Sequence, residues 1–501
     1  MSRVIAPLQT PLDRHWPGGA AGSARQEDLR AAMLRVQRVH FVGIGGVGMC
    51  GIAEVMHHLG FVVTGSDQKD SARLQRLRNL GIPVALGHAA QQVEGADVVV
   101  VSSAISIENP EVAAALAQGT PVVRRAEMLA ELMRFSQGIA VAGTHGKTTT
   151  TSLIAALLTA GGQDPTWVIG GKLMRAGTHA RLGAGRVLVA EADESDASFL
   201  HLLPMLAVVT NIDADHLEAY GGDVQRLEQA FVEFMQRLPF YGRAIVCSDD
   251  AGVQRVLTQV SRPLIRYGLE QGADVRAVDV RATATGTDFR VVRSEAPDLQ
   301  VSLALSGEHN VRNALAAIAI ASELGVADED IVRGLAEFEG IARRFESYGA
   351  FILPDAQGRS RHVEVIDDYA HHPRELQAVL QAARARWPQR RIVLVFQPHR
   401  YTRTRDLFDA FVAVLSQADG LLLLDVYAAG EAMLAGSSTA DLLRALRARG
   451  EVEPVHATDV TDALTVLPGM LQDQDVVLFC GAGNIGQAAE QWRTALAEVT
   501  A

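Results

Sequence analysis

The segment Gly143-Thr144-His145-Gly146-Lys147-Thr148-Thr149-Thr150 constrains the fold more than any other part of this 501-residue chain. It follows the apolar run 138–142 and leads into a helical stretch. A strand, a glycine-rich turn, a lysine and a helix form a cradle whose backbone N–H groups bind a polyphosphate. Lys147 is expected to contact the β- and γ-phosphates and Thr148 to bind Mg²⁺. We therefore predict an ATP site of a shortened type, because Val141 stands where the strict pattern has a further glycine.

Short apolar strands and amphipathic helices alternate along the rest of the chain. This rhythm predicts an α/β fold with mostly parallel sheets and helices on both faces. Residues 273–305 instead alternate polar and apolar side chains, which predicts antiparallel hairpins. Strands are expected at 39–43, 61–65, 96–101, 138–142, 186–190, 206–210, 244–247, 363–366, 391–396, 420–424 and 475–479, and helices at 47–59, 73–80, 152–160, 223–237 and 307–323.

The length suggests about three domains at ~150 residues each. We place the boundaries near 136 and 344, where new α/β patterns begin. The expected order is a flexible extension (1–35), a Rossmann-like domain (36–136), a central P-loop ATPase-type domain with a small antiparallel element (137–344) and a Rossmann-like C-terminal domain (345–501).

Composition excludes several classes of protein. A net charge of −12 argues against a nucleic-acid partner bound by bulk electrostatics. The three cysteines are far apart in sequence, so they indicate neither a disulfide framework nor a zinc ribbon. No apolar run approaches the ~20 residues that span a bilayer, and residues 1–36 do not resemble a signal peptide. We expect a cytoplasmic protein without a membrane partner.

A second glycine-rich loop, Gly43-Ile44-Gly45-Gly46-Val47-Gly48, lies between a strand and a helix, with Asp67 at the end of the next strand. Glycines let the backbone approach a pyrophosphate, and the carboxylate can accept hydrogen bonds from a sugar. NAD and a UDP-sugar both fit this pattern. The similar segment 481–486 has no following strand to supply an acidic partner, so we interpret it as a turn that packs the last helix.

Carboxylates follow the strands after the phosphate cradle. Glu191 ends one strand in a cluster of acidic residues, and His216 follows the next. Because parallel strands end at one edge of the sheet, Glu191 and Thr148 are expected to meet at one Mg²⁺. A second divalent ion held by Glu191 and His216 would neutralise the charge that develops in phosphoryl transfer.

The C-terminal third carries polar residues after two strands, at 367–373 and 397–405. Arg400 and Arg403 offer planar donors for a carboxylate or phosphate. Asp368 and the neighbouring histidines are candidates for holding or deprotonating an ammonium group. A zinc site at His371 and His372 lacks a third ligand at metal spacing.

Together these segments resemble the Mur ligases, the ATP-dependent amide-forming enzymes of peptidoglycan precursor synthesis. The resemblance runs in order from about 36 to 490 and is carried by residues 40–49, 100–105, 124–129, 143–150, 191–198, 210–216, 307–313 and 343–345 and by the Tyr369 and Arg400 segments.

The resemblance implies roles for residues that the patterns alone do not assign. ATP would be bound by Gly143, Thr144, His145, Gly146, Lys147, Thr148, Thr149, Asn310 and Arg344, and the metal by Thr148, Glu191 and His216. A UDP-sugar site would be formed by Gly45, Gly46, Asp67, Ser102, Ser103, Arg124 and Arg125, and an amino-acid site by Tyr369, His371, His399, Arg400 and Arg403. Lys147, Glu191, His216, His371 and Arg400 would be catalytic.

The implied reaction joins L-alanine to the lactyl carboxylate of UDP-N-acetylmuramate through an acyl phosphate, with ATP and two Mg²⁺ ions, or Mn²⁺, as cofactors. These small molecules would be the partners of a monomer or weak homo-oligomer. The nearest alternative is a ligase that recycles a murein tripeptide onto the same UDP-sugar. An NAD-dependent oxidoreductase that binds its cofactor at Gly43 to Asp67 would give Lys147, Glu191 and His216 no function. A nucleotide sensor without enzymatic activity would leave the Tyr369 and Arg400 clusters unexplained.

Overall fold

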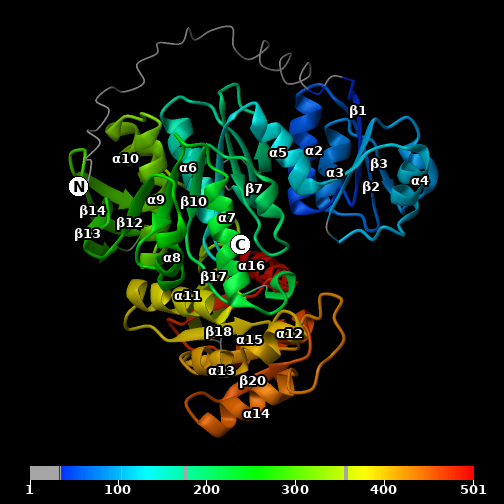
Figure 1. Ribbon diagram of the computed structural model, residues 1–501. Helices are drawn as coiled ribbons and strands as arrows, with labels where there is room; N and C mark the ends of the chain where they lie inside the picture. The colour runs from blue at the N-terminus through cyan, green and yellow to red at the C-terminus, as the bar shows by residue number, and fades with distance from the viewer. Residues whose placement is uncertain are drawn as a thin grey trace.

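The computed structural model describes residues 33, 35–102, 104–173, 178–215, 217–283, 285–354 and 359–500. Its elements form three units, each built around one sheet. In Figure 1 the N-terminal unit, in blue, lies beside the central unit, in cyan to green, and the C-terminal unit, in yellow to red, lies below the central one. The extension predicted at 1–35 falls almost entirely outside the described residues.

The N-terminal unit has five parallel strands in the order β3-β2-β1-β4-β5. Its central strands are apolar and buried on both faces, as expected for a parallel sheet covered by helices. The elements are β1 (Arg38–Val42), α2 (Val47–His58), β2 (Val62–Asp67), α3 (Ala72–Asn79), β3 (Val84–Leu86), β4 (Val98–Val101), α4 (Pro110–Gln118), β5 (Val122–Arg124) and α5 (Arg125–Arg134).

The central unit has ten strands in the order β15-β14-β13-β12-β11-β10-β6-β9-β7-β8. The strands from β13 to β7 run parallel, and β14, β15 and β8 add antiparallel edges. The elements are β6 (Gln137–Ala142), α6 (Lys147–Ala160), β7 (Thr166–Leu173), β8 (Thr178–Arg181), β9 (Val187–Glu191), β10 (Leu206–Val209), α7 (Val224–Gln236), β11 (Arg243–Cys247), α8 (Ala251–Val256), β12 (Leu264–Gly268), β13 (Val275–Ala282), β14 (Thr287–Arg293), β15 (Leu299–Leu303), α9 (Glu308–Glu323) and α10 (Asp328–Ala336).

The C-terminal unit has six strands in the order β16-β17-β21-β18-β19-β20, parallel except for β16. The elements are β16 (Glu346–Pro354), β17 (Ser360–Asp368), α11 (Pro373–Arg386), β18 (Ile392–Phe396), α12 (Tyr401–Asp406), α13 (Phe408–Leu415), β19 (Gly420–Leu424), α14 (Thr439–Arg449), β20 (Pro454–Ala457), α15 (Val460–Met470), β21 (Val476–Cys480) and α16 (Ile485–Thr500). The loop at 481–484 turns the chain from β21 into α16, as predicted.

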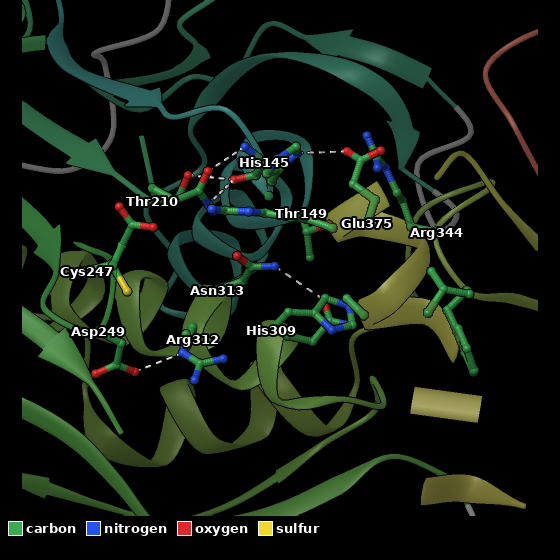
Figure 2. A pocket seen from close by; sticks show the side chains of 18 of the residues that line it. His145, Thr149, Thr210, Cys247, Asp249, His309, Arg312, Asn313, Arg344 and Glu375 are labelled. Atoms are coloured by element: carbon green, nitrogen blue, oxygen red, sulfur yellow. Dashed lines mark hydrogen bonds and ion pairs between the residues drawn. The ribbon is translucent and has the colours of Figure 1, made fainter. Parts of the chain in front are cut away.

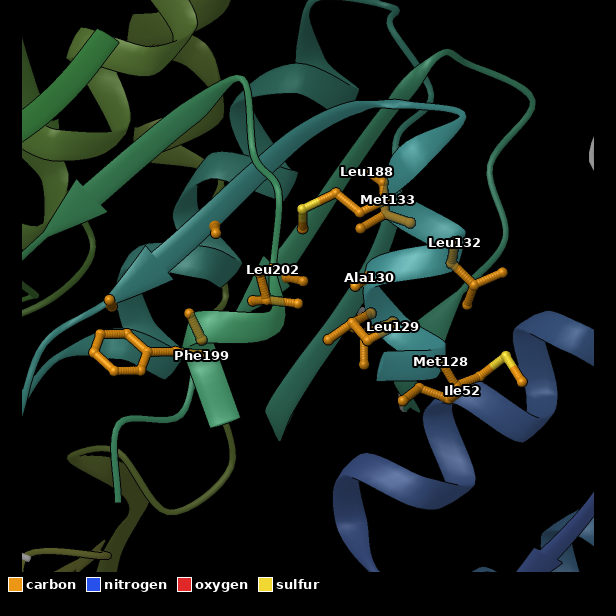
Figure 3. Close-up of a cluster of buried hydrophobic side chains, with 14 of the residues drawn as sticks. Ile52, Met128, Leu129, Ala130, Leu132, Met133, Leu188, Phe199 and Leu202 are labelled. Atoms are coloured by element: carbon orange, nitrogen blue, oxygen red, sulfur yellow. The ribbon is translucent and has the colours of Figure 1, made fainter. Parts of the chain in front are cut away.

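The N-terminal and central units share a hydrophobic core. Figure 3 shows the apolar residues of α5 between Ile52 of α2 and Leu188 of β9. Gly51 of α2 also packs closely on the central unit, where a β-carbon would lie 3.0 Å from the side chain of Ala180. Removing this buried apolar surface from water stabilises the contact between the two units. We therefore treat them as one rigid body.

The junction between the central and C-terminal units is sharply bent. Arg343 and Phe345 both have left-handed backbone, with φ of 60° and 51°. The Arg343 guanidinium donates to the carbonyl oxygen of Gly481 at 2.6 Å and pairs with Asp367 at 3.1 Å. The Phe345 N–H donates to Asp368 at 2.6 Å. These contacts fix the bend to the C-terminal unit.

The predicted α/β class and the hairpins at 273–305 are confirmed. The helix predicted at 152–160 begins earlier, at Lys147, because the turn ends at Gly146 and the next residue is already helical. Among the described residues, no helix has the length and apolar character needed to cross a membrane.

Candidate functional site

The phosphate loop, defined here as residues 143–146, connects β6 to α6. Gly143 has φ of 133°, and a side chain there would collide with the Thr210 hydroxyl, so the turn requires glycine. The main chain of His145 is held on both sides. Its N–H donates to the Asn211 side chain at 2.8 Å, and its carbonyl accepts from the Thr210 hydroxyl at 2.6 Å. The residues after β10 therefore set the shape of the loop.

Lys147 turns its ammonium group back over the phosphate loop. Nζ donates to the carbonyl oxygens of Gly143 at 2.6 Å and Thr144 at 3.2 Å, and pairs with Glu194 at 2.8 Å. Burial lowers the pKa of Lys147, but the charge of Glu194 and its acidic neighbours raises it overall, so the amine stays charged. Burial raises the pKa of Glu194 to about 7, although Lys147 opposes this rise. Glu194 belongs to the predicted acidic cluster, but no role was assigned to it.

Thr148 and Glu191 lie together at the carboxyl edge of the central sheet. The Thr148 hydroxyl is 3.0 and 3.1 Å from the two carboxylate oxygens of Glu191, and one of these oxygens also accepts the N–H of Gly170 at 2.6 Å. Carboxylate and hydroxyl oxygens are the hard ligands that Mg²⁺ prefers, so this pair fits a magnesium ion. His216, the other predicted ligand, lies outside the described residues.

A cavity of about 300 Å³ lies next to the phosphate loop (Figure 2). One wall comes from the central unit and the other from the junction and α11, so the cavity exists only where the two units meet. The predicted nucleotide residues Asn310 and Arg344 both line it. Its lining residues also include Gly146, Thr149, His309, Asn313, Asp368 and Glu375.

The His145 side chain reaches from the phosphate loop to the C-terminal unit. Its Nε2 is 3.3 Å from the carboxylate of Asp213, and its Nδ1 is 3.2 Å from that of Glu375. Burial opposes a charge on the ring, but the bonds to these carboxylates outweigh it and raise the pKa of His145 to about 9. His145, Asp213 and His372 place ligand atoms within 4.8 Å of one another. In this structure the His145 ring contacts the carboxylates of Asp213 and Glu375, so we describe it as an ion pair.

A second cavity, of about 430 Å³, lies at the carboxyl edge of the N-terminal sheet. Four predicted residues, Gly45, Gly46, Asp67 and Ser102, line it. The Asp67 carboxylate accepts the N–H of Gly45 at 2.9 Å, which ties the glycine loop to the end of β2. Ser103 lies outside the described residues. The loop and the acidic residue thus share one cavity, as a nucleotide-diphosphate site requires.

Arg124 and Arg125 lie at the start of α5 and are not among the described residues that line this cavity. Arg125 packs against Gly48, the last glycine of the loop, and pairs with Asp193 at 3.6 Å. Asp193 in turn belongs to the acidic cluster near Lys147. Arg125 therefore connects the glycine loop of the N-terminal unit to the acidic cluster of the central unit.

His88, which sequence patterns did not indicate, also lines the N-terminal cavity. Its Nδ1 is 3.1 Å from the buried carboxylate of Glu111, which also accepts the Ser66 hydroxyl at 2.6 Å. The three residues are widely separated in sequence and show no common spacing, so only the folded sheet brings them together.

The predicted amino-acid residues form one cluster after β17 and β18. The ring of His371 is 5.3 Å from that of Tyr369 and 5.9 Å from that of His399, centre to centre. The His371 Nδ1–H donates to the carbonyl of Tyr369 at 3.0 Å, so Nε2 is left with the lone pair. Burial lowers the pKa of His371 to about 4, and Arg403 adds to this effect. His371 is therefore a neutral acceptor.

The two arginines of this cluster face carboxylates. Arg403 is 3.4 Å from Asp215 of the central unit, and Arg400 is 3.9 Å from Glu218 and 3.8 Å from Glu431. Both side chains thus lie along the boundary between the units.

Asp368, a candidate for contact with an ammonium group, also holds the junction. Its two oxygens accept the N–H groups of Phe345 and Ala370, at 2.6 and 2.7 Å. The carboxylate therefore stabilises the junction, and its contact with an ammonium group stays a prediction, as it does for the histidines.

Glu375 is the main site residue that sequence reasoning missed. A signal was present, because His372-Pro373-Arg374-Glu375 has the spacing of a helix N-terminus whose third residue folds back onto the N-cap. The sequence did not show that this residue would also reach the phosphate loop.

These features define a nucleotide-dependent α/β enzyme. Sequence profiles of one family match three successive stretches of the chain. The profile described as "Mur ligase family, catalytic domain" matches residues 38–137, "Mur ligase middle domain" matches 141–321, and "Mur ligase, glutamate ligase domain" matches 355–483.

Curated relatives match nearly the whole chain. The UDP-N-acetylmuramate–L-alanine ligases of Bordetella avium and Halorhodospira halophila are each 56% identical to it, over 91% and 92% of this chain and 98% and 93% of theirs. The solved UDP-N-acetylmuramate-alanine ligase of Thermotoga maritima is 28% identical, with a TM-score of 0.76 over 92% of this chain and 99% of that one. A murein peptide ligase of Psychrobacter arcticus shares the fold, at 24% identity and a TM-score of 0.67 over 93% of this chain and 100% of that one. The chain belongs to the Mur ligase family.

Proposed function

We propose that this protein joins L-alanine to the lactyl carboxylate of UDP-N-acetylmuramate, with hydrolysis of ATP to ADP and phosphate, in peptidoglycan precursor synthesis. The observation that carries the proposal is the 56% identity, over more than nine-tenths of the chain, to relatives named for this activity. The position of the phosphate loop supports it, since the loop lies between the glycine-lined cavity and the histidine and arginine cluster.

ATP would occupy the cavity beside the phosphate loop, with Asn310 and Arg344 at the nucleotide and Lys147 at its β- and γ-phosphates. Thr148, Glu191 and His216 would hold Mg²⁺, with Mn²⁺ as a substitute. The metal would supply positive charge that neutralises the phosphates. The UDP-sugar would lie in the N-terminal cavity.

In the first step, a lactyl carboxylate oxygen attacks the γ-phosphorus, and the bond to the β–γ bridging oxygen breaks. The products are an acyl phosphate and ADP, and Lys147 stabilises the phosphate oxygens. Phosphorylation is required because a free carboxylate is a poor acyl donor.

In the second step, the alanine nitrogen attacks the acyl carbon. Arg400 and Arg403 bind the alanine carboxylate, and the neutral His371 accepts the proton that the amine loses. The tetrahedral intermediate then collapses to the amide and inorganic phosphate.

An acyl phosphate hydrolyses readily, so water must be excluded. We assign the closing motion to the junction near 344, because the N-terminal and central units share a core. Solution scattering with both nucleotides bound should show a smaller radius of gyration than the free protein. Equal radii would count against closure.

The same proposal places domain boundaries near 136 and 344, with residues 1–35 as an extension. It takes the protein to be a cytoplasmic monomer or weak homo-oligomer whose partners are small molecules.

Phosphate release with UDP-N-acetylmuramate and ATP, measured with alanine, glycine, serine and the murein tripeptide, tests the proposal. We expect the highest kcat/KM with alanine. Release that requires the tripeptide would support the recycling ligase, and NADH formation in a parallel assay with added NAD⁺ would support the oxidoreductase. Either result would overturn the proposal.

A further inference from the structure

The carboxylate of Glu375 joins two parts of the site that are far apart in sequence. Oε1 lies 3.2 Å from Nδ1 of His145, in the phosphate loop. Oε2 accepts the N–H groups of His371 at 3.0 Å and His372 at 3.2 Å, at the amino-acid cluster. Both partners of the ion pair are largely buried, at 17% exposure for His145 and 16% for Glu375. The contact is thus shielded from bulk water, which strengthens it.

The His145 side chain is free to serve this contact, because the loop does not depend on it. The shape of the loop comes from the main chain of His145, which Thr210 and Asn211 hold. Asp213 fixes the other ring nitrogen at 3.3 Å, so the imidazole is oriented from the central unit toward Glu375.

The charges of this pair favour a strong contact at neutral pH. The pKa of His145 is raised to about 9, so the ring is positive. Burial works against ionisation of Glu375, but the hydrogen bond and charge of His145, together with the charge of Arg344, hold its pKa well below the usual range. Hydrogen bonds between two charged groups are about twice as strong as those between neutral groups.

We propose that His145 is a positioning residue. It holds the Glu375 carboxylate, which in turn fixes the main chain of His371. In this way His145 keeps the predicted amino-acid cluster in place next to the phosphate loop. The inference rests on the proposed function, since it takes His371 to be a contact of the amino acid. His145 acts through Glu375 and needs no contact of its side chain with a substrate.

Several other contacts join the units without touching Glu375. Arg374 pairs with Asp213 at 2.9 Å, and Arg403 with Asp215 at 3.4 Å. Loss of the His145 side chain should therefore loosen the segment at 371–372 without separating the units. This predicts a selective defect in the use of the amino acid.

Two variants remove the contact from opposite sides. In His145→Asn the side chain is too short to bridge both carboxylates, while its main-chain N–H can still bond Asn211. In Glu375→Gln the capping hydrogen bonds remain, because glutamine also serves in a capping box, but the charge is lost. We expect each variant to raise the KM for alanine about tenfold. The KM for UDP-N-acetylmuramate should change by less than about twofold.

The double variant tests whether the two residues act as one unit. If they do, His145→Asn combined with Glu375→Gln should raise the KM for alanine no more than either single change. Additive effects, or equal increases in all three KM values, would overturn the proposal.

Amide hydrogen exchange of the peptide at 369–376, with Mg²⁺ and a non-hydrolysable ATP analogue bound, gives a readout that does not depend on turnover. We expect faster exchange in His145→Asn than in the wild type. The matched control is Glu218→Gln, which removes the pair of Glu218 with Arg400 between the units without touching His145, Asp213 or Glu375, and it should leave the exchange rate unchanged. Unchanged exchange in His145→Asn would overturn the proposal. A wild-type protein that released no phosphate with alanine would overturn the proposed function instead, and the exchange result would still decide the role of His145.

Discussion

Replacing Lys147 by methionine should separate the stability of the fold from the chemistry of the site. The Lys147 ammonium pairs at 2.8 Å with Glu194, whose side chain is only 2% exposed. Breaking a buried ion pair by removing one partner costs about 3–5 kcal/mol, because the other charge is left uncompensated. Glu194 can reduce this cost by binding a proton, since its pKa is already about 7.

The cost should therefore depend on pH. In the folded wild type the pKa of Glu194 is raised from 4.5 to about 7, so its carboxylate is mostly protonated at pH 6, where loss of Lys147 removes little attraction. At pH 8 it is mostly charged, and without Lys147, which lowers this pKa, the variant must either bury the charge or bind a proton. We expect Lys147→Met to lower the free energy of unfolding by about 2–3 kcal/mol at pH 8 and by about 1 kcal/mol or less at pH 6. Urea denaturation at both pH values measures the difference.

The control is the double variant with Glu194→Gln, which removes the buried charge. It should recover the stability of the wild type to within about 1 kcal/mol at pH 8. Phosphate release should remain at least about 1000-fold below the wild type in both variants, because the phosphate-binding cation is missing. Calorimetry should show unchanged binding of UDP-N-acetylmuramate.

Three results would refute this reasoning. Equal destabilisation at pH 6 and pH 8 would show that the charge of Glu194 does not set the cost. Failure of Glu194→Gln to restore stability would mean that Lys147 stabilises the fold through other contacts. Loss of UDP-sugar binding in Lys147→Met would show that the two nucleotide sites have been assigned wrongly.

Chelation of divalent metal with EDTA should stop phosphate release, and Mg²⁺ or Mn²⁺ should restore it; turnover in excess chelator would rule out a required metal. His145→Asn should lower the free energy of unfolding most below pH 6.5, by about 3 kcal/mol at most. The loss should shrink as the pH rises through 9, because the pKa of His145 is about 9 in the folded state. Denaturation curves from pH 6 to 10 that show a constant difference would contradict this. Gly65→Ala should lower the free energy of unfolding by about 1–3 kcal/mol and reduce the Tm. The new β-carbon would lie 2.6 Å from the Ile44 side chain and 2.8 Å from the carbonyl oxygen of Phe41. An unchanged Tm would show that β1 and β2 can move apart to make room for it. Asp67→Asn should weaken UDP-sugar binding at least about fivefold and leave binding of an ATP analogue intact, as calorimetry can test.

The parallel part of the fold could be predicted from sequence because its strands are continuous apolar runs between turn residues. The same reasoning brought Thr148 and Glu191 together, since neighbouring parallel strands end at one edge of the sheet. Strand β8, at the edge of the central sheet, and its neighbour β7 were not predicted. Gly170 and Gly171 interrupt the apolar pattern of β7, and β8 is short and partly polar.

The contacts between units could not be predicted in the same way. His145 and Glu375 are 230 residues apart, and their contact depends on how the C-terminal unit packs against the phosphate loop. No periodicity within a strand or helix encodes that arrangement. Arg125 is a similar case, because its pairing with Asp193 follows from the packing of α5 between two sheets.

The bend at Arg343 and Phe345 has a mechanical consequence. A left-handed residue with a side chain is disfavoured by about 1–2 kcal/mol, so a chain that needed only a loose tether would place glycine at such positions. Here the hydrogen bonds and ion pair of Arg343 and Phe345 hold the bend to the C-terminal unit, so this elbow, residues 343–345, is stiff and moves with that unit. Arg344 lies within the elbow and also lines the nucleotide cavity, so any swing of the C-terminal unit carries one wall of that cavity with it.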